Sequence, residues 1–532
     1  MRLQPRREAM TFSARSLERT AQSFWPRSST ARVSARSLAR RVDTLAGVAA
    51  AAPRVVILDH YFGQDIAALR ETAGRAVEWR VVPYFRFRDA ANRIFPESVQ
   101  HGLAPYSAPV LAEVRARYAR RLRREVGRLY REWPFDVFVL PSDTFYYVRE
   151  LRPICHALGV PVIVVQKETT ITDETFERHA PDVGAHAPFV ADRMTVCSER
   201  HKSFWVRAGA DPELIEVTGQ PRFDAYSSDR PRPTWTGVGL DEAPRTVLFL
   251  SYQIDAYLHA GPTEPAELDW GSLRAQTEAA LYEAVQHGWR VVVKLHPQQP
   301  YDDEARRLRA AAPRCGQDVV LAQPDADTRL LLLLADAVVG FQSTALLEAL
   351  ALPKPVAYAG WGGLHDAMAA GLIPFGSLAG LMKLASSGDD LSSWLSSVPV
   401  PPDEETVAQR RALVEAYLGP FDGLASERTL AVIARLAGEW SAKREESPWR
   451  RRLDRLVLPS ALGSLGRGAA QLPALRALGA AGRAVGWGRV VAGADVRRAT
   501  VGERLLRARQ AVRDGYPRGS ARRAQRMPPT SA

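Results

Sequence analysis

Cysteine is scarce in this 532-residue chain, with Cys155, Cys197 and Cys315 far apart and in no Cys-x-x-Cys spacing. This pattern argues against a disulfide scaffold and against a zinc site built on paired cysteines, and it fits a reducing cytoplasm. Long apolar runs are also missing. Because no stretch of about 18 apolar residues occurs, no membrane-spanning helix is expected. The sequence therefore predicts a cytoplasmic protein.

Lysine is the second scarce residue type, since only six of the 71 basic residues are lysine. This skew is typical of genomic base composition, so an arginine says little by itself, and a lysine at a ligand-binding turn is more informative. The net charge of +12 is also uneven, with +7 in residues 1–52, +14 in residues 441–532 and −9 between them. The basic character belongs to the two ends of the chain.

The length and a hydrophobic content of 46% predict two domains plus tails. A Pro/Gly-rich stretch in the middle of the chain marks the boundary between the domains. We expect a basic mobile tail at 1–52, an N-terminal acceptor domain at 53–229, a linker at 230–245, a C-terminal donor domain at 246–440 and an Arg-rich amphipathic or disordered tail at 441–532.

Short runs rich in β-branched residues alternate with helical stretches in both predicted domains. Strands are predicted at 54–59, 78–83, 136–140, 160–165, 193–198 and 215–218, and then at 247–250, 290–294, 319–321, 337–339 and 355–358. Helices are predicted at 65–73, 108–133, 147–158, 271–287 and 328–335, with a mostly helical stretch at 404–439. Continuous apolar strands and this alternation indicate βαβ units, an α/β fold class and parallel sheets.

Two turns of the second domain carry the side chains best suited to bind phosphate. Lys294 and His296 follow one strand, and Ser343 and Thr344 open a helix after another, with Glu348 one turn further along. Ligands of parallel sheets bind at the carboxyl ends of the strands, where cations and free helix N–H groups neutralise phosphate. The alternatives are a structural histidine, two ordinary helix-capping residues and an ordinary helix glutamate in place of a ribose ligand.

Further candidate binding residues lie in the first domain. Gly63 follows the first strand, where a glycine lets a ligand approach the backbone closely. Arg222 either reaches the cleft between the domains or pairs with Asp224.

Several motifs together resemble the GT-B glycosyltransferases of bacterial surface-polysaccharide assembly. They are Val217 to Asp224 (VTGQPRFD), Lys294 to Pro297 (KLHP), Ser343-Thr344 with Glu348, and Lys354-Pro355-Val356. The chain is most similar to capsule polysaccharide transferases and CDP-glycerol glycerophosphotransferases, over residues 55–440. This resemblance implies two facing Rossmann-like domains, with the nucleotide bound by the C-terminal domain, the acceptor by the N-terminal domain, and no bound metal or cofactor.

One departure from that family concerns the catalytic base. Many relatives carry a His-Gly or acidic-Gly pair after the strand equivalent to 160–165, where this chain has Gln166-Lys167-Glu168-Thr169-Thr170. A sugar hydroxyl must lose a proton as it attacks, and a shielded carboxylate can accept it. We therefore predict Glu168 as general base, with Asp143 and His179 as alternatives. The other interpretations of this loop are a solvated Lys167–Glu168 pair and a Lys167 that binds an acidic acceptor.

The predicted function is transfer of a sugar, or a glycerol-phosphate-like group, from a cytidine- or uridine-nucleotide donor to a surface polysaccharide or lipid-linked acceptor. The alternatives are a UDP-sugar 2-epimerase-like enzyme and a non-catalytic GT-B-fold binding protein. Amphipathic stretches such as Trp449 to Arg455 and Val501 to Arg513 predict peripheral binding to the anionic inner face of the plasma membrane. No motif predicts a nucleic-acid partner.

Overall fold

The computed structural model describes residues 52–60, 62–100, 106–167, 171–172, 175–227, 233–243, 245–252, 270–297, 299–312, 314–323, 325–363, 365 and 372–446. The predicted amphipathic stretches of the C-terminal tail, the N-terminal tail up to residue 51 and Glu168 lie outside these residues. None of the helices in the described ranges combines the length and the apolarity needed to cross a bilayer.

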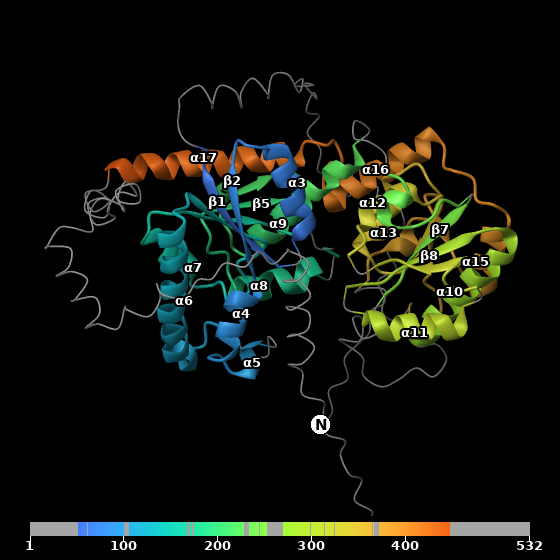
Figure 1. The fold of residues 1–532 in the computed structure, drawn as a ribbon, viewed down its shortest axis with the longest axis horizontal. Helices are drawn as coiled ribbons and strands as arrows, with labels where there is room; N and C mark the ends of the chain where they lie inside the picture. Colours follow the sequence, from blue (N-terminus) through green and yellow to red (C-terminus); the bar gives the residue numbers. More distant parts are fainter. Residues whose placement is uncertain are drawn as a thin grey trace, which may run out of the picture. The chain divides into compact units, whose positions relative to one another are not determined.

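Two six-stranded sheets, both with parallel strands throughout, form the framework of the described chain (Figure 1). The first has the order β2-β1-β3-β4-β5-β6. Its strands are β1 (Arg54–Asp59), β2 (Glu78–Pro83), β3 (Val137–Leu140), β4 (Val162–Val165), β5 (Arg193–Val196) and β6 (Ile215–Val217). This sheet is the core of a Rossmann-like N-terminal domain.

The second sheet has the order β12-β11-β10-β7-β8-β9. Its strands are β7 (Thr246–Leu250), β8 (Arg290–Lys294), β9 (Val319–Leu321), β10 (Ala337–Gly340), β11 (Val356–Tyr358) and β12 (Lys383–Leu384). The predicted fold class, α/β with two Rossmann-like domains of parallel strands, is confirmed.

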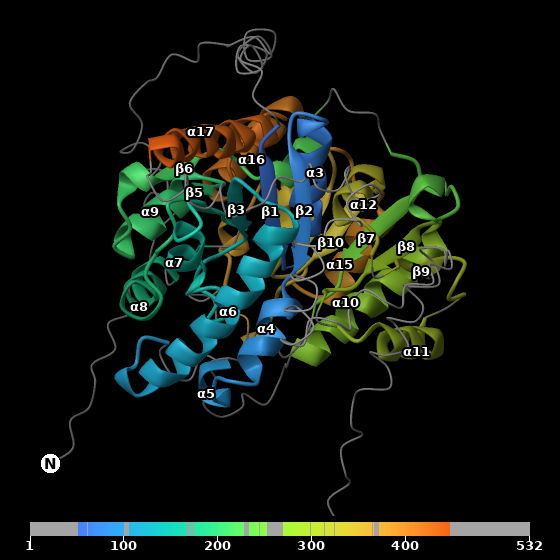
Figure 2. The same ribbon diagram turned by 60° about the vertical axis from the view of Figure 1, so that its left-hand side comes forward.

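Opposite faces of the first sheet are covered by different helices, because successive side chains of a strand point to opposite faces. Val55 and Ile57 of β1 pack with α3 (Gly63–Ala73) and α17 (Ala425–Glu446). Val56 and Leu58 belong to the core formed with α4 (Phe85–Asn92), α6 (Ala112–Glu132) and α7 (Leu151–His156). Figures 1 and 2 show α17 running along the first sheet, although it follows the second sheet in the sequence.

The remaining elements are short connectors and helices that cover the sheets. The α-helices are α5 (Glu97–Gln100), α8 (Ala180–His186), α9 (Glu199–Arg207), α10 (Trp270–Ala284), α11 (Tyr301–Ala311), α12 (Thr328–Leu334), α13 (Thr344–Leu350), α15 (Gly388–Ser396) and α16 (Glu404–Leu418). The tighter turns are η1 (Pro109–Leu111), η3 (Pro212–Leu214), η4 (Pro221–Tyr226), η5 (Thr236–Val238), η7 (Val285–His287) and η9 (Phe375–Ser377), and η2 (Thr175–His179) is a π-helix.

All eleven predicted strands are present, while the two-residue strand β12 was not predicted. The stretch predicted as mostly helical at 404–439 consists of two helices, α16 and α17, with a break that starts at Gly419. Gly419 has a φ of 82°, and a Cβ atom there would lie 1.7 Å from the carbonyl oxygen of Cys197. Only glycine fits this close approach. Because its positive φ is incompatible with a right-handed helix, α16 ends at this point.

Candidate functional site

In each sheet the order of successive strands changes direction at one position. Open α/β sheets bind ligands at such positions. In the first sheet the reversal lies between β1 and β3, and in the second between β7 and β10. The residues that follow these strands include His60 and Asp143 in the N-terminal domain, and Ser251 and Ser343 in the C-terminal domain.

The turn after β8 is held to the turn after β7 by hydrogen bonds. The backbone N–H of Ser251 donates to the carbonyl of Lys294 (3.0 Å), and the Gln299 side chain donates to the Ser251 hydroxyl (3.1 Å). The side-chain amide oxygen of Gln299 in turn accepts from the backbone N–H of His296 (2.8 Å). Lys294 and His296 are therefore presented on a braced turn at the carboxyl edge of the second sheet.

Lys294 and His296 lie in an environment that disfavours their own positive charge. Burial lowers the pKa of Lys294, and the carboxylates of Asp325 and Asp327 partly offset this effect. Burial also lowers the pKa of His296, and the nearby charges of Lys167 and Lys294 lower it further. An anion bound here would offset the repulsion among Lys167, Lys294 and His296, because it attracts each positive charge.

Lys167, at the carboxyl end of β4, connects the two sheets electrostatically. Its charge lowers the pKa of His60 in the first domain as well as that of His296 in the second. A direct contact also joins the domains, since the Gln64 amide donates to an Asp327 carboxylate oxygen at 3.1 Å. We refer to His60, Lys167, Lys294 and His296 as the basic cluster.

His60 belongs to this cluster, although the sequence does not single it out as a binding residue. Its Nδ1 lies 3.0 Å from the Tyr147 hydroxyl, and its ring centroid lies 4.2 Å from that of Tyr84 and 4.6 Å from that of Phe145. Burial, reinforced by the charges of Arg88 and Lys167, lowers the pKa of His60 to about 4. The imidazole is therefore neutral at neutral pH. The only sequence signal was its position directly after the first strand.

Ser343 and Thr344 begin α13, a helix of seven residues. The Ser343 hydroxyl accepts from the backbone N–H of Ala345 at 3.2 Å, which is an ordinary helix cap. The capping alternative is therefore present in the structure. Both side chains are half-buried, and their role in phosphate binding stays a prediction.

Arg222 and Glu348 are brought together, although 126 residues separate them. The Arg222 guanidinium donates to one carboxylate oxygen of Glu348 at 3.0 Å, and the Tyr226 hydroxyl donates to the other at 2.5 Å. Both side chains of the ion pair are buried, with relative exposures of 8% and 4%. Binding of ribose by Glu348 would require this network to open.

The pairing of Arg222 with Asp224, which was the alternative expected from the sequence, does not form, because both residues bond to other partners. The Asp224 carboxylate accepts from the backbone N–H groups of Ala425 and Ser426 at 2.9 and 2.8 Å, at the start of α17. The Lys354 ammonium donates to the Leu333 carbonyl at 3.1 Å and to neighbouring carbonyls at the end of α12. These two parts of the family motif have structural roles.

Gly63 is the first residue of α3 and is exposed. No atom of the described protein lies within 4 Å of the position that a Cβ would occupy there. The space is open, so protein packing alone does not require a glycine at this position.

The candidate bases occupy different surroundings. Asp143 is 2% exposed, and one carboxylate oxygen accepts from the backbone N–H groups of Val190 (2.7 Å) and Ala191 (3.0 Å). The other oxygen is buried and has no hydrogen-bond partner among the described residues. Burial raises the pKa of Asp143 above its ordinary value, although the two backbone N–H groups and the charge of Arg149 oppose this effect. His179 is exposed at the end of η2, and Glu168 lies outside the described residues.

Within the described ranges, no group of three or more His, Cys, Asp or Glu residues could hold a metal ion.

No protein-family model and no curated protein matches the sequence. Among solved structures, the chain is similar to UDP-GlcNAc 2-epimerase from Neisseria meningitidis bound to UDP-GlcNAc, with 12% identity, a TM-score of 0.42, and 72% of this chain and 99% of that chain covered. It is also similar to the glycotransferase of kitacinnamycin, with 14% identity, a TM-score of 0.39, and coverages of 72% and 99%. A third similar structure is HepE from Anabaena in complex with UDP and glucose, with 14% identity, a TM-score of 0.36, and coverages of 72% and 99%. These likenesses are distant, so what the chain binds has to be inferred from its own residues.

Proposed function

We propose that the chain is a nucleotide-sugar enzyme of the GT-B type, a transferase that moves a sugar or a glycerol-phosphate-like group from a cytidine or uridine nucleotide to an acceptor. The basic cluster is the observation that carries this proposal. Two lysines and two neutral histidines gather at the carboxyl ends of strands from both sheets, and the charge of Lys167 acts on a histidine of each domain. Such a site suits the diphosphate of an activated sugar.

The proposed chemistry depends on stabilising the departing nucleotide. As the bond between sugar and phosphate breaks, negative charge develops on the phosphate oxygens. Lys294 and His296 are held on a braced turn and face this charge without having to reorganise, which is where electrostatic catalysis is most effective. The Ser343 hydroxyl and the backbone N–H groups at the start of α13 would add hydrogen bonds.

The acceptor, a surface polysaccharide or a lipid-linked glycan, is assigned to the N-terminal domain. Its attacking hydroxyl would lose a proton to a base on that domain. Glu168 remains the first candidate, with Asp143 and His179 as alternatives. His60 joins them, because its imidazole is neutral at neutral pH and lies beside Lys167.

A UDP-sugar 2-epimerase would need several carboxylates and histidines around a single sugar ring. Of the residues predicted for that role, Asp143 uses one carboxylate oxygen to hold two backbone N–H groups, and His179 is exposed on η2. These placements provide fewer groups around one sugar ring than an epimerase would need, which supports the transferase over the epimerase.

The proposal is tested by titrating UDP, CDP, CMP and GDP into the protein by calorimetry. We expect a uridine or cytidine nucleotide to bind, and Lys294→Met to weaken its affinity by about tenfold or more, because a charge-assisted hydrogen bond to phosphate is lost. His287→Ala is the matched control, since His287 is an exposed histidine at the end of η7 in the same domain. The proposal is wrong if no nucleotide binds, or if Lys294→Met binds as well as the wild type.

A second arm of this experiment separates the three functions. The protein is incubated with the sugar donor of the nucleotide that binds, with and without a glycan acceptor, and the sugar is followed by NMR. A transferase releases nucleotide when the acceptor is present. Inversion at C2 without acceptor would identify an epimerase, and an unchanged donor in both reactions would identify a binding protein.

A further inference from the structure

A hollow of about 350 Å³ lies between α4 and α6 of the N-terminal domain, apart from the basic cluster. Five of its seven lining residues are arginines: Arg93, Arg117, Arg120, Arg121 and Arg124. The other two, Ala90 and Ile94, are apolar. We call it the arginine hollow, and neither the proposed donor site nor any sequence motif accounts for it.

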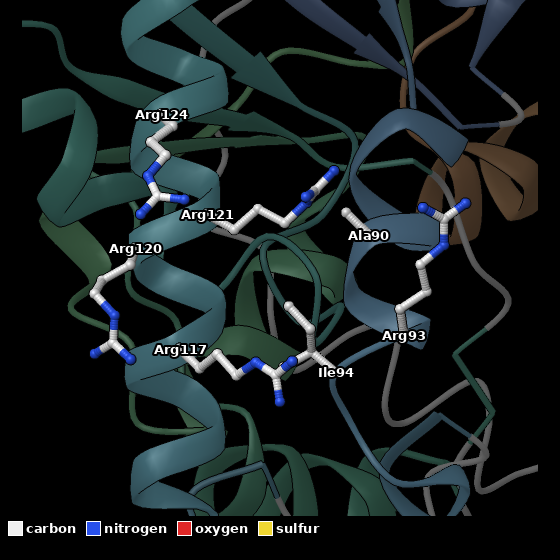
Figure 3. A pocket seen from close by; sticks show the side chains of 7 residues that line it. All are labelled: Ala90, Arg93, Ile94, Arg117, Arg120, Arg121 and Arg124. Atoms are coloured by element: carbon white, nitrogen blue, oxygen red, sulfur yellow. The ribbon is translucent and has the colours of Figure 1, made fainter.

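The spacing of the arginines explains how α6 presents them together. Arg117, Arg121 and Arg124 recur at intervals of four and three residues, so they share one side of the helix. Figure 3 shows Arg117 and Arg121 extending from α6 toward Ile94 and Ala90. The opposite stripe of α6, which includes Tyr118 and Leu122, is buried in the core and fixes the rotation of the helix.

The charge of the arginine hollow is not neutralised by the described part of the protein. None of the five arginines forms an ion pair there, and no acidic side chain lines the space. Of the three acidic residues of α6, Glu125 pairs with Arg86 at 3.2 Å and Glu132 with Arg128 at 3.2 Å. Glu113, in the first turn, lies four residues before Arg117 and forms no ion pair within the described ranges. Like charges at positions i and i+4 destabilise a helix, so a bound anion would relieve a repulsion built into α6.

The chemistry of the lining selects a class of ligand. A guanidinium group bonds two oxygens of one phosphate through its planar fork, which a scattered surface charge does not achieve. Arg117 and Arg121 extend into the space, three more arginines line it, and Ala90 and Ile94 form its apolar α4 side. This lining suits a compact anion that carries several charges and many oxygens. We propose that the arginine hollow binds a diphosphate or closely spaced phosphate group, and that the acceptor carries this group.

The link to the acceptor rests on the proposed function and on the position of α4. Tyr84 precedes α4 and packs on His60 of the basic cluster, while Arg93 directly follows the last residue of α4 and lines the arginine hollow. Nine residues of helix span about 14 Å. Arg88, between them, stacks on Tyr84 at 4.7 Å and extends the positive charge toward His60. An acceptor anchored by its phosphates at Arg93 would thus extend along α4 toward the transferred sugar.

The experiment is a calorimetric titration of inorganic pyrophosphate into the full chain and into two double variants. Arg117→Ser/Arg121→Ser removes two arginines of the hollow. Arg123→Ser/Arg131→Ser removes the same charge from the same helix at positions that do not line the hollow. We expect the first variant to weaken pyrophosphate binding roughly 10- to 100-fold and the control to change it less than twofold. Equal losses in both variants would overturn the proposal, because they would reflect general surface charge.

Further arms test the chemistry of the ligand. Arg117→Lys/Arg121→Lys keeps the charge but removes the forks, so full affinity in this variant would overturn phosphate recognition by guanidinium groups. Tighter binding of farnesyl diphosphate than of pyrophosphate would assign the group to a lipid-linked acceptor, and equal binding would assign it to a phosphorylated glycan. Binding of an oligonucleotide or of phosphatidylglycerol vesicles without any binding of pyrophosphate would overturn the proposal.

The outcome is kept separate from that of the donor site by repeating each titration in Lys294→Met. This substitution removes a cation from the basic cluster, where pyrophosphate could also bind. Absence of uridine and cytidine nucleotide binding would contradict the transferase alone. Unchanged pyrophosphate affinity in Arg117→Ser/Arg121→Ser would contradict the arginine hollow alone.

Discussion

At the scale of single residues, the protonation state of His296 connects structure to ligand binding. Burial and two neighbouring lysines hold its pKa below the usual value of 6.5 in the ligand-free protein. A phosphate beside the imidazole would favour its charged form and raise the pKa. Binding should therefore be accompanied by proton uptake at any pH between the free and the bound pKa.

We predict that affinity for the nucleotide-sugar increases as the pH falls through the bound-state pKa of His296, by up to about tenfold per pH unit. It should level off below the free-state pKa, where the imidazole is charged before binding. Calorimetry between about pH 5 and 8 measures the affinity and, from the dependence of the heat on the buffer, the proton uptake. A nucleotide-sugar is preferable to UDP because its doubly esterified diphosphate does not titrate in this range.

His296→Gln is the matched variant for this prediction, because it keeps a hydrogen-bond donor and removes the titration. Its affinity should vary little with pH. A pH dependence identical to that of the wild type would assign the proton to another group.

At the scale of secondary structure, α17 joins the end of the described chain to its beginning. Its buried residues Val432, Ile433 and Leu436 pack with Ile57 and other odd-numbered strand residues of the first sheet. The sequence placed this helix in the C-terminal domain, from residue 246 to 440. Its apolar residues instead complete the core of the N-terminal domain, which would otherwise leave one face of a parallel sheet partly open to water.

We predict that Leu436→Ala lowers the free energy of unfolding by about 2–5 kcal/mol, because a fully enclosed leucine leaves a cavity against the sheet. Gly438→Ala is the control, since Gly438 is an exposed helix residue with no atom within 4 Å of the added Cβ. That variant should raise stability by about 0.5–1 kcal/mol. Urea denaturation measures both, and a loss below about 1 kcal/mol for Leu436→Ala would show that α17 is not tightly packed.

Sequence patterns predicted the elements whose signals are local. The strands were identifiable because runs such as Val291 to Val293 are apolar on both faces, and Lys294 and His296 because they end such a run. The partners of these elements depend on contacts between distant residues. The Arg222–Glu348 pair spans 126 positions, and α17 reaches back to β1.

The arginine hollow was hidden for a different reason. Its arginines are regularly spaced on α6, but most basic residues of the chain are arginine, so the spacing did not stand out. The helix α4, which forms the other side of the hollow, was not predicted at all. A composition bias thus concealed a feature that becomes evident only when two helices are placed side by side.

At the scale of the described molecule, the buried ion pair between Arg222 and Glu348 joins the end of the first domain to the second. We predict that Glu348→Gln lowers the free energy of unfolding by about 3–5 kcal/mol, because it leaves the buried Arg222 charge uncompensated. The control is Glu177→Gln, which makes the same change in a surface pair, Arg207–Glu177, with exposures of 41% and 65%. That change should cost less than about 1 kcal/mol.

Urea denaturation again provides the measurement for this pair. The double variant Arg222→Met/Glu348→Met should recover most of the loss, because well-packed apolar side chains replace a buried ion pair at little net cost. Equal destabilisation by Glu348→Gln and Glu177→Gln would contradict the buried pair.

Within the described residues the chain passes between its two sheets after β6 and again between α16 and α17, and these two passages contact each other. Asp224 caps the start of α17, and Phe223 stacks on Phe421 with ring centroids 4.8 Å apart. Because these two connecting segments are held to each other by contacts, we expect them to act as one hinge that resists rotation of one domain about the other along any other axis. We therefore expect that any opening of the domains rotates them about this hinge, so that Lys167 and His296 separate while Arg222 and Glu348 stay in contact.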